Sequence, residues 1–411
     1  MQSVREDADY IIAEALKASL PDTAVKKALK EIPESNGKTV LIAVGKAAWQ
    51  MAQAAWDELG NDISCGAVVT KYGHSKGKIG NLEIYEAGHP VSDDNTYIAT
   101  SRCLELVSDL KKQDRVLFLL SGGGSALFEV PRVSPEENQS ITKQLLASGA
   151  DIVEINTIRK RLSKVKGGRF ALLCKPAHVF TIVLSDIIGD PLDMIASGPA
   201  YPDSSTTQQA LKIADKYNLI LSEEAVKLLK EDTPKELDNV TTYVTGSVKQ
   251  LCVSASESAE KLGYSPMFLT ACLSCEAREA GSMLASIAKD HFYSNKSLAF
   301  IMGGETVVHL TGKGKGGRNQ EIALSAAIGL NGLKNCAVFS VGSDGTDGPT
   351  DAAGGYIDSN TFENLKEKGI DISAVLKDND AYNALKQSNG LIITGPTGTN
   401  VNDLSVLLIK K

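Results

Sequence analysis

Short apolar strands alternate with helix-like segments along most of the chain, and this alternation limits the possible folds more than any other feature. Each strand-like run is rich in Val, Ile, Leu or Phe, and most are followed by a longer segment with helical periodicity. The main runs occupy residues 39–44, 115–120, 178–184, 241–245, 267–270, 298–302 and 336–341. Strands that alternate with helices are typical of parallel sheets flanked by helices. We therefore predict an α/β fold with mainly parallel sheets in both halves of the chain.

The length of the chain predicts two domains. A chain of 411 residues is longer than a single hydrophobic core usually serves. The segment Glu231–Asn239 is charged, contains a proline and lacks periodicity, so it is the best linker candidate. We predict a Rossmann-like N-terminal α/β domain over residues 1–235 and a smaller α/β C-terminal domain over residues 236–401. The last strand, at about residues 402–411, is expected to pack back on the N-terminal domain.

Charge and composition restrict the kinds of partner. The formal net charge of −7 disfavours general affinity for nucleic acid or an anionic membrane, whereas local positive clusters suit small anionic substrates. The N-terminus lacks the apolar core of a signal peptide, and no apolar run reaches membrane-spanning length. Seven cysteines scattered through apolar surroundings are typical of a reducing cytosol. We expect a cytoplasmic enzyme of small-molecule metabolism, with a homodimer as the candidate assembly.

A glycine-rich loop with several cations follows the strand at residues 298–302. Glycines let backbone N–H groups approach a ligand closely, and the helix start that follows adds unpaired donors and a partial positive charge. An anion such as a phosphate is the ligand that such a loop is built to hold. The candidate binding residues of the loop and of the helix start are Gly312, Lys313, Gly314, Lys315, Gly316, Gly317, Arg318 and Asn319.

A second glycine-rich loop follows the strand at residues 115–120. Three consecutive glycines between two serines, directly after a buried strand, predict another backbone nest for an anion. A nucleophilic serine is less favoured, because the G-x-S-x-G pattern is absent. The residues of this loop are Ser121, Gly122, Gly123, Gly124 and Ser125.

Further cations lie at the strand-to-helix switch after residues 39–44 and in a basic run. Lys46 stands at the carboxyl edge of the predicted parallel sheet, where open α/β folds bind ligands. A lysine at a helix start opposes the helix dipole, so a functional reason for it is favoured. The basic run includes Arg159, Arg161 and Lys164, and it fits either a solvated helix face or a substrate site.

Carboxylates follow two of the predicted strands. Asp344, Asp347 and Asp351 lie on a glycine-rich loop after residues 336–341, and Asp186 and Asp190 follow residues 178–184. Carboxylates suit magnesium, and cations directed at phosphate beside a magnesium site are what phosphoryl transfer requires. The predicted metal candidates are Asp190, Asp344, Asp347 and Asp351, with ATP as co-substrate and Mg²⁺ as cofactor.

Two other classes of protein remain as alternatives. Gly312-x-Gly314-x-x-Gly317 matches the dinucleotide fingerprint formally, which favours a nicotinamide-dependent oxidoreductase as the second candidate. However, the fingerprint prefers small or apolar residues where this loop has Lys315, and no carboxylate lies at the usual interval. A non-catalytic ligand-binding protein is the third class. It is disfavoured because ligand loops with complementary chemistry occur in both halves.

Several motifs also resemble a known family. Residues 303–321, 342–355 and 394–404, together with VGKAA around Lys46, SGGGSAL and LSKVKGGRFA, are similar to the signature segments of the MOFRL family of glycerate kinases. The resemblance covers nearly the full length and implies an ATP-dependent kinase that forms 2-phosphoglycerate in a cleft between two α/β domains. In that family, the residues that match Lys46 and Arg318 are the principal catalytic cations. Asn400, in the last of these segments, is a further candidate binding residue.

The sequence departs from the family at one position, and the family's history leaves one alternative activity. The family often has a histidine where Arg161 stands, although an added cation would still suit an anionic acceptor. The same family was long labelled as hydroxypyruvate reductase, so an NAD(P)-dependent hydroxypyruvate reductase stays the alternative. For the kinase, we expect one glycine-rich loop to bind the ATP phosphates and the other the glycerate carboxylate. We expect Asp186 to accept the proton of the C2 hydroxyl.

Overall fold

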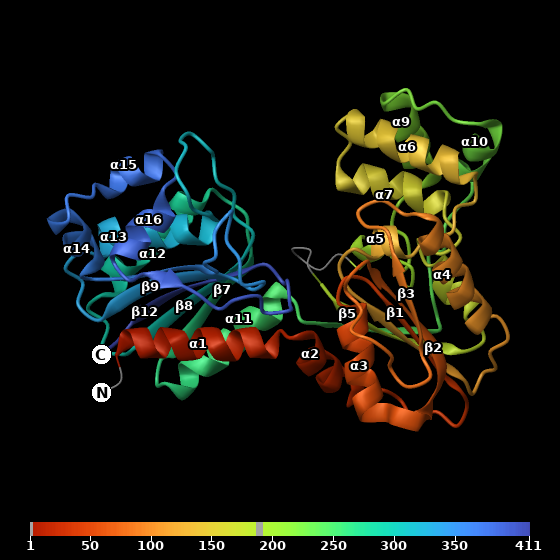
Figure 1. Cartoon of the computed structure of the whole chain (residues 1–411), viewed down its shortest axis with the longest axis horizontal. Coiled ribbons are helices and arrows are strands. Elements are labelled where there is room, and N and C mark those ends of the chain that lie inside the picture. The colour runs from red at the N-terminus through yellow and green to blue at the C-terminus, as the bar shows by residue number, and fades with distance from the viewer. Residues whose placement is uncertain (1–2, 186–191) are drawn as a thin grey trace. The chain divides into compact units, whose positions relative to one another are not determined.

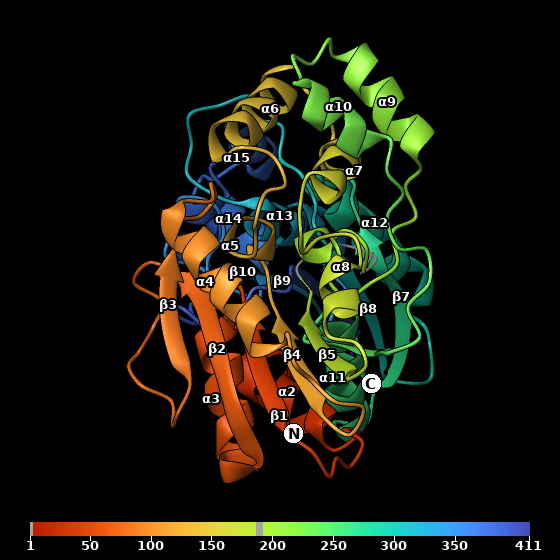
Figure 2. The same ribbon diagram turned by 90° about the vertical axis from the view of Figure 1, so that its right-hand side faces the viewer.

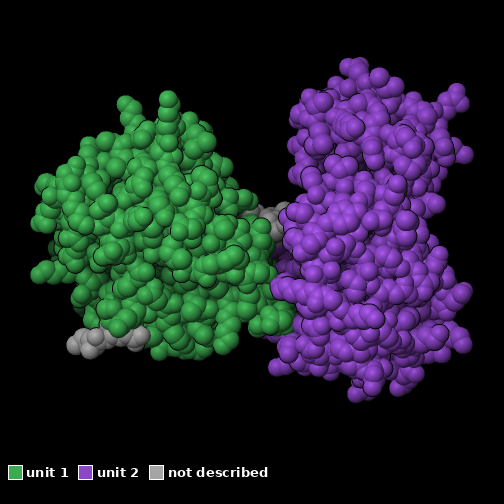
Figure 3. All heavy atoms as spheres, in the orientation of Figure 1, with its two compact units in different colours: residues 1–23, 186–189, 246–411 green, residues 24–185, 190–245 purple. Residues whose placement is uncertain are grey.

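The computed structural model describes residues 3–185 and 192–411, which divide into two compact units (Figure 3). One unit comprises residues 24–185 and 192–245, and the other comprises residues 3–23 and 246–411. Within the described residues, each unit is built on a six-stranded sheet. The predicted α/β class is therefore confirmed. The change of unit follows Thr245, because the strand at residues 240–245 belongs to the first sheet.

The first sheet is parallel throughout, as predicted, and its strands have the order β3-β2-β1-β4-β5-β6. Figure 2 shows the strands from β3 to β5. Its central strands β1 and β4 are almost completely buried because helices cover both faces, which explains their continuous apolar sequences. All six strands end at the same edge of the sheet, so the loops that follow them gather there. The strands are β1 Thr39–Val44, β2 Ile63–Lys71, β3 Glu83–Ala87, β4 Arg115–Leu120, β5 His178–Leu184 and β6 Val240–Thr245.

Helices on this sheet fall into two groups. Helix α3 packs on β1 and β2, and helix α4 packs on β2 and β3. Away from the sheet, helices α6, α7, α9 and α10 pack on one another around an apolar cluster of their own that includes Ile155, Ile158 and Leu228 (Figure 1). The bounds are α2 Pro21–Leu29, α3 Ala48–Leu59, α4 Asp94–Leu106, α5 Gly124–Leu127, α6 Pro135–Ala147, α7 Ile152–Arg161, α8 Arg169–Leu173, α9 Thr207–Lys216 and α10 Glu223–Leu229.

The second sheet is mixed, with the order β11-β10-β9-β12-β8-β7. Within the described residues, only β7 and β8 pair in parallel, and the other pairs are antiparallel. The prediction of parallel strands in both halves is therefore wrong for this half. Apolar runs that are buried on both faces carry no signal for strand direction, which long-range pairing decides. The strands are β7 Ser265–Leu273, β8 Leu298–Gly304, β9 Cys336–Gly342, β10 Gly354–Asp358, β11 Leu391–Ile392 and β12 Asp403–Ile409.

The C-terminal strand does not pack on the first sheet. β12 pairs with both β8 and β9 along its whole length, and each of its seven residues is buried. The prediction that residues 402–411 return to the N-terminal domain is thus wrong. A fully buried strand needs hydrogen-bond partners for its backbone on each side, and the place between β8 and β9 supplies two.

Helices cover both faces of the second sheet (Figure 1). Helix α11 packs on β7 and β8. Helix α1 packs on α11 and β9 and adds residues from the start of the chain to this unit. The other face carries α12 and α13, with the shorter α14, α15 and α16 beside α13. No helix among the described residues is long and apolar enough to cross a membrane. The bounds are α1 Val4–Ala18, α11 Val248–Lys261, α12 Ala277–His291, α13 Arg318–Leu330, α14 Thr361–Glu367, α15 Ile372–Lys377 and α16 Ala381–Gln387.

Candidate active site

The loops after β1 and β4 hold each other in place at the carboxyl edge of the first sheet. The Lys46 N–H donates to the Gly122 carbonyl at 2.8 Å, and the Ala47 N–H donates to the Ser121 hydroxyl at 3.1 Å. Gly45 has a φ of +122°, and a Cβ there would lie 2.2 Å from the Ser121 Oγ, so only glycine fits. The buried Ser121 thus serves the scaffold, and this scaffold fixes the backbone at Lys46.

The side chain of Lys46 is exposed, and no ion pair or hydrogen bond of its Nζ is found among the described residues. A Cβ at Gly123 would lie 3.2 Å from the Lys46 Cγ and 3.0 Å from the His89 ring, so the three residues are neighbours. Burial and the nearby charges of Lys46, Lys71 and His74 lower the pKa of His89 below its usual value. Lys46 therefore has a neutral histidine beside it and a charge that remains available for a ligand.

The Ser121–Ser125 loop offers backbone donors next to Lys46. Gly123 has a φ of +87° and precedes the single turn α5. Within the described residues, the Gly122 and Gly123 N–H groups donate to no other group. The Ser125 hydroxyl lies 3.3 Å from the Ser197 hydroxyl, which donates to Asn156 Oδ1 at 2.8 Å. These two donors are thus available to a ligand, and the anion-binding nest stays a prediction.

The basic run divides into buried and accessible cations. Lys160 and Arg161 are completely buried, and both pair with Asp203, at 3.0 Å from the Lys160 Nζ and 3.8 Å from the nearest Arg161 nitrogen. Arg161, expected at the substrate site, therefore stabilises the interior. Lys164 is exposed, and the half-buried Arg159 has no hydrogen-bond partner among the described residues. These two keep charges that a ligand can use.

Arg159 lines a cavity of about 310 Å³ in the same unit. Burial lowers the pKa of Arg159, and the nearby charge of Glu129 opposes this effect. Glu129 is itself 5% exposed and pairs with the buried Lys166 at 2.7 Å between Oε2 and Nζ. The cavity wall further includes His89, Gly123, Ser125, Asn138 and Gln139.

In the other unit, the glycine-rich loop at residues 311–317 is bound to the segment Asp378–Asp380. The Gly312 N–H donates to Asn379 Oδ1 at 3.0 Å, and the Gly314 N–H donates to the Asp378 carbonyl at 2.8 Å. The N–H groups of Lys313 and Lys315 donate to the Asp378 and Asp380 carboxylates. A Cβ at Gly312 would lie 2.2 Å from the Asp378 carbonyl oxygen. The close approach that the glycines permit is therefore to the chain itself.

Lys313 and Lys315 project from this loop with exposed side chains. The Lys315 ammonium lies 4.3 Å from the centre of the Tyr382 ring, and the Tyr382 hydroxyl donates to Asp351 Oδ1 at 2.7 Å. Asp351, a predicted metal ligand, thus has one oxygen engaged and does not line the large cavity of this unit. Asn400 is exposed on the loop before β12.

Asp347 caps the start of α13. Its carboxylate accepts the N–H groups of Asn319 at 3.1 Å and of Gln320 at 2.9 Å, and it also accepts from the Gln320 side chain. Asn319 in turn accepts the Ser340 hydroxyl at 2.6 Å. Burial raises the pKa of Asp347 to about 6, against the opposing effect of these backbone donors. An internal carboxylate therefore occupies the helix terminus that was expected to bind a phosphate.

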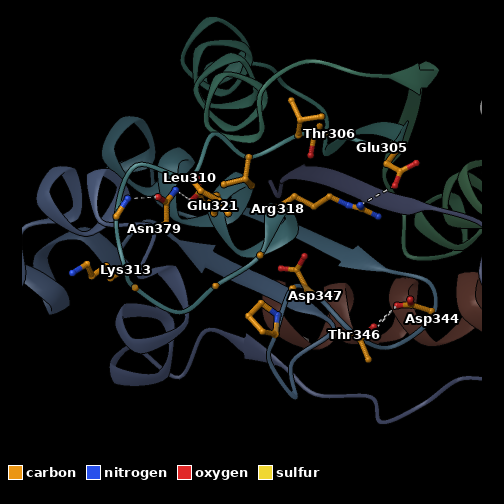
Figure 4. A pocket seen from close by; sticks show the side chains of 18 residues that line it. Glu305, Thr306, Leu310, Lys313, Arg318, Glu321, Asp344, Thr346, Asp347 and Asn379 are labelled. Carbon is orange, nitrogen blue, oxygen red and sulfur yellow. Dashed lines mark hydrogen bonds and ion pairs between the residues drawn. The ribbon is translucent and has the colours of Figure 1, made fainter. Parts of the chain in front are cut away.

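Arg318, the first residue of α13, is held by two carboxylates, of which Figure 4 shows that of Glu305. Its Nε and Nη2 donate to the two oxygens of Asp403 at 2.5 and 3.1 Å, and its Nη1 donates to Glu305 Oε1 at 2.9 Å. The Asp403 side chain is 6% exposed, whereas that of Glu305 is 49% exposed. Burial opposes the charge of the guanidinium, but the bonds and charge of Asp403 raise the pKa of Arg318.

Arg318 lines a cavity of about 840 Å³ in this unit (Figure 4). Val307, Val308, Leu310 and Pro349 supply apolar wall, and Gly316 and Gly317 supply backbone. Two polar side-chain atoms of the wall, Thr306 Oγ1 and Glu321 Oε2, are buried without a hydrogen-bond partner among the described residues, although Arg278 Nη2 lies 3.7 Å from the Glu321 oxygen. The size and the mixed lining suit a nucleotide.

The described carboxylates do not form a ready metal cage. Within residues 3–185 and 192–411, no group of three or more His, Cys, Asp or Glu side chains could hold a metal ion. Asp344 lines the 840 Å³ cavity and uses its Oδ1 for the Thr346 N–H and hydroxyl, so the other oxygen remains for a ligand. Mg²⁺ commonly takes one or two carboxylates together with substrate phosphates, and Asp344 fits that use. Asp186 and Asp190 lie outside the described residues.

Several residues of the site escaped the sequence analysis. Asp403 and Glu305 hold Arg318, Glu129 faces the smaller cavity, and Asp378 and Asp380 hold the glycine-rich loop. Asp403 and Glu129 carry a weak signal, because each is a single acid at the edge of an otherwise apolar run. The other three are acids on an ordinary polar surface, and only the fold reveals their partners.

Comparison with known proteins gives two family matches and several full-length relatives. Residues 7–230 match a domain of unknown function, DUF4147, and residues 298–403 match the MOFRL family. The chain is 54% identical to a D-glycerate 2-kinase of Thermotoga maritima, over 99% of both chains. It is 39% identical to a glycerate 2-kinase of Pyrococcus horikoshii, over 99% of this chain and 97% of that protein. A protein of Agrobacterium vitis named as a hydroxypyruvate reductase is 40% identical over 91% of this chain and all of that protein.

A solved structure supports the same relation. The crystal structure of a glycerate kinase from Thermotoga maritima has a TM-score of 0.92 at 54% identity, and the match covers 98% of this chain and 99% of that one. This agreement extends through both sheets. The chain therefore belongs to the family that joins a DUF4147 domain to a MOFRL domain and that includes the glycerate 2-kinases of Thermotoga maritima and Pyrococcus horikoshii.

Proposed function

We propose that this protein is an ATP-dependent D-glycerate 2-kinase, which transfers the γ-phosphoryl group of ATP to the C2 hydroxyl of D-glycerate. The observation that carries the proposal is the 54% identity to the Thermotoga maritima D-glycerate 2-kinase over 99% of both chains. The sites agree with it, because each unit has a cavity lined by an arginine and a glycine-rich loop. Such groups suit a reaction between two anionic substrates.

ATP is proposed to bind in the 840 Å³ cavity of the unit that contains Arg318. The apolar wall suits a nucleoside, and the buried Thr306 and Glu321 oxygens are available to a base or a ribose. Arg318 at the same wall suits the phosphate groups. Asp344 would hold Mg²⁺, which would neutralise phosphate charge and order the phosphate oxygens when bound.

Lys46 and Arg318 are proposed as the catalytic cations. A phosphoryl group in transfer spreads negative charge over its equatorial oxygens, and fixed cations stabilise that charge most in a site that excludes water. Arg318 is fixed by Asp403, and the backbone at Lys46 is fixed by the loop after β4. In the proposed transfer, the C2 oxygen bonds to the γ-phosphorus, ADP leaves and the hydroxyl proton passes to a base. Asp186 stays the predicted base.

The hydrogen bonds of the glycine-rich loop argue against the oxidoreductase alternative. A dinucleotide loop must present free N–H groups to the pyrophosphate. Here the N–H groups of Gly312 and Gly314 already donate within the chain, and Asp347 caps the helix start. NAD(P)H absorbance with hydroxypyruvate as substrate is therefore expected to stay constant.

A phosphorus NMR spectrum tests the proposed function directly. Purified protein with D-glycerate, ATP and Mg²⁺ should produce 2-phosphoglycerate, whose phosphorus signal is a doublet because C2 carries one hydrogen. A triplet would identify 3-phosphoglycerate and would contradict the proposed position of transfer. No phosphoglycerate at all would contradict the kinase itself. The cytoplasmic location and the homodimer remain predictions, which cell fractionation and light scattering can test.

A further inference from the structure

Three charged side chains line the 310 Å³ cavity beside Gly123. Lys143 is exposed, whereas the Glu129 carboxylate and the Arg159 guanidinium are opposite charges that the fold leaves incomplete. Both face a space that is larger than a three-carbon acid and smaller than half of the nucleotide-sized cavity of the other unit. Lys46, which lies next to Gly123, is close to one wall of this space.

Glu129 is fixed, yet one of its oxygens lacks a donor. Its Oε2 pairs with the Lys166 Nζ at 2.7 Å, and its backbone N–H donates to the Thr100 hydroxyl at 3.1 Å. Lys166 is completely buried and also donates to the Phe128 carbonyl, so the pair cannot swing into solvent without a large cost. Glu129 Oε1 is buried without a hydrogen-bond partner among the described residues. A buried acceptor without a donor costs free energy, so a donor from a ligand is expected here.

Arg159 is the one cation of its helical turn that the fold leaves available among the described residues. The adjacent Lys160 and Arg161 point inward and are paired with Asp203. Arg159 has no hydrogen-bond partner among the same residues and lines the cavity. A planar guanidinium with free N–H groups matches the two oxygens of a carboxylate. A cavity that combines such a group with an unpaired acceptor fits a small acid that also carries a hydroxyl.

We propose that this cavity is the acceptor subsite, in which Arg159 binds the carboxylate of the acid and Glu129 Oε1 accepts a hydrogen bond from its C3 hydroxyl. The inference rests on the proposed kinase function and deepens it, because it assigns the acid to this cavity and the nucleotide to the other unit. The C2 hydroxyl is then left for phosphoryl transfer. Gly123, whose N–H donates to no other group among the described residues, and Ser125 line the same space.

This arrangement predicts selection for dihydroxy acids. A site that is built to hydrogen-bond a substrate hydroxyl rejects the analogue without it by a factor of about 10⁴–10⁵, because its own polar group is then left unpaired. D-Lactate has the carboxylate and the C2 hydroxyl of D-glycerate but lacks the C3 hydroxyl. We expect kcat/KM for D-lactate to be lower than for D-glycerate by a factor of this order.

A direct measurement of glycerate binding tests the subsite independently of phosphoryl transfer. D-Glycerate is titrated into the full-length protein by calorimetry, with a non-hydrolysable ATP analogue and Mg²⁺ present. Arg159→Met should weaken the binding of glycerate by about 10- to 100-fold, and Arg159→Lys should restore part of it. Arg102→Met is the matched control, because Arg102 is a half-exposed arginine of the same unit whose ion pairs among the described residues are with Glu83 and Glu105. It should bind glycerate like the wild type, and all variants should bind the nucleotide equally.

Glu129→Gln tests the second contact. The variant should lower kcat/KM for D-glycerate and leave that for D-lactate nearly unchanged, so that the two substrates become similar. An equal loss for both substrates would overturn the hydroxyl contact, because it would identify a role in the reaction itself. Glu129→Gln removes the charged partner of the buried Lys166, so the variant could fail to fold. In that case, the ratio of kcat/KM for D-glycerate to that for D-lactate, measured for the wild-type enzyme and for Arg159→Lys, still tests the subsite.

The outcomes distinguish the two proposals. Wild-type turnover with unchanged glycerate binding in Arg159→Met would overturn the subsite and leave the kinase intact. Similar kcat/KM values of wild-type enzyme for glycerate and lactate would overturn the role of Glu129. Absence of any phosphoglycerate from wild-type enzyme would overturn the proposed function and the subsite with it.

Discussion

Replacing Asp403 by asparagine distinguishes the contributions of the two carboxylates that hold Arg318. Asp403 and Glu305 both bond to the same guanidinium, but their environments differ greatly: the Asp403 side chain is 6% exposed and that of Glu305 is 49% exposed. Asp403→Asn keeps the volume and removes the charge, and its amide would turn an N–H toward Arg318. Glu305→Gln makes the same chemical change on the exposed side, so it serves as the matched control.

The structure sets the expected magnitudes. Loss of one partner of a fully buried ion pair costs about 3–5 kcal/mol, because the remaining charge is left uncompensated. The Arg318 side chain is 34% exposed, so water can compensate part of this loss. We therefore expect Asp403→Asn to destabilise its unit by about 2–3 kcal/mol, and Glu305→Gln by about 0–1 kcal/mol.

Two assays measure the effect. Near-UV circular dichroism on heating should show the transition of this unit lowered by roughly 4–12 °C in Asp403→Asn, as expected for a unit of about this size. Steady-state kinetics should show kcat reduced by about 100-fold in the same variant, because Arg318 loses its orientation, with a smaller change in KM for ATP. Glu305→Gln should keep its thermal transition and its kcat.

A clear result would refute this reasoning. If Asp403→Asn and Glu305→Gln showed the same thermal transition and the same kcat, then burial of Asp403 would not fix Arg318. If Asp403→Asn lost stability but kept the wild-type kcat, Asp403 would be structural and Arg318 would not need to be held for the reaction.

Three further predictions concern the loops and Lys46. Lys46→Ala should reduce kcat by at least about 100-fold while its melting curve stays unchanged, because its Nζ has no partner among the described residues and acts only on a ligand; a coupled ATP assay and calorimetry check this. Gly314→Ala should destabilise its unit by about 1–3 kcal/mol in thermal unfolding, since a Cβ would lie 2.4 Å from the Asp380 Cβ and 2.6 Å from the Asp378 carbonyl oxygen. His89 should titrate below 6.5 by NMR, and Lys46→Met should raise its pKa, because burial and the Lys46 charge both disfavour the imidazolium. Since the folded-state pKa lies below the unfolded one, His89 contributes stability at neutral pH that is lost as the pH falls below the unfolded pKa and through the lower folded pKa. An unchanged pKa of His89 in Lys46→Met would contradict an electrostatic effect of Lys46 on His89.

Most strands could be predicted from the sequence, but the strand directions of the second sheet could not. Continuous apolar runs identified β1, β4, β5, β8 and β9, because a strand covered on both faces has no polar side. The buried strand β10, which begins with two glycines, was not predicted. Burial on both faces also hides direction, so β12 was assigned to the wrong sheet. Its seven buried residues are compatible with any sheet that has an open place. Only the pairing with β8 and β9 distinguishes them.

The sequence predicted that the glycine-rich loops contact anions, but it did not predict which anions. Glycines and helix starts indicate that an anion approaches the backbone, and at residues 311–320 an anion does. The anions are the carboxylates of Asp378, Asp380 and Asp347. The loop at residues 121–125 is also rich in glycine, but its Gly122 and Gly123 N–H groups donate to no other group among the described residues. The sequence cannot distinguish these cases, because the acidic partners lie far away along the chain.

The same principle, that internal carboxylates decide which cations remain available, leads to a final prediction about Glu305. Arg318 with Asp403 and Glu305 carries a net charge of −1, so an arriving phosphate meets a group that repels it at long range and attracts it only at the guanidinium. Asp403 is buried and cannot leave, whereas Glu305 is half exposed and competes with the phosphate for Arg318 Nη1. Glu305→Gln should therefore lower KM for ATP by about 3- to 10-fold at low ionic strength, and the difference should shrink in high salt, where exposed charges are screened. Initial rates over a range of ATP and KCl concentrations measure this. A KM for ATP that rises in Glu305→Gln would mean that Glu305 assists nucleotide binding, for example by supporting the magnesium ion, and that Arg318 does not exchange Glu305 for phosphate.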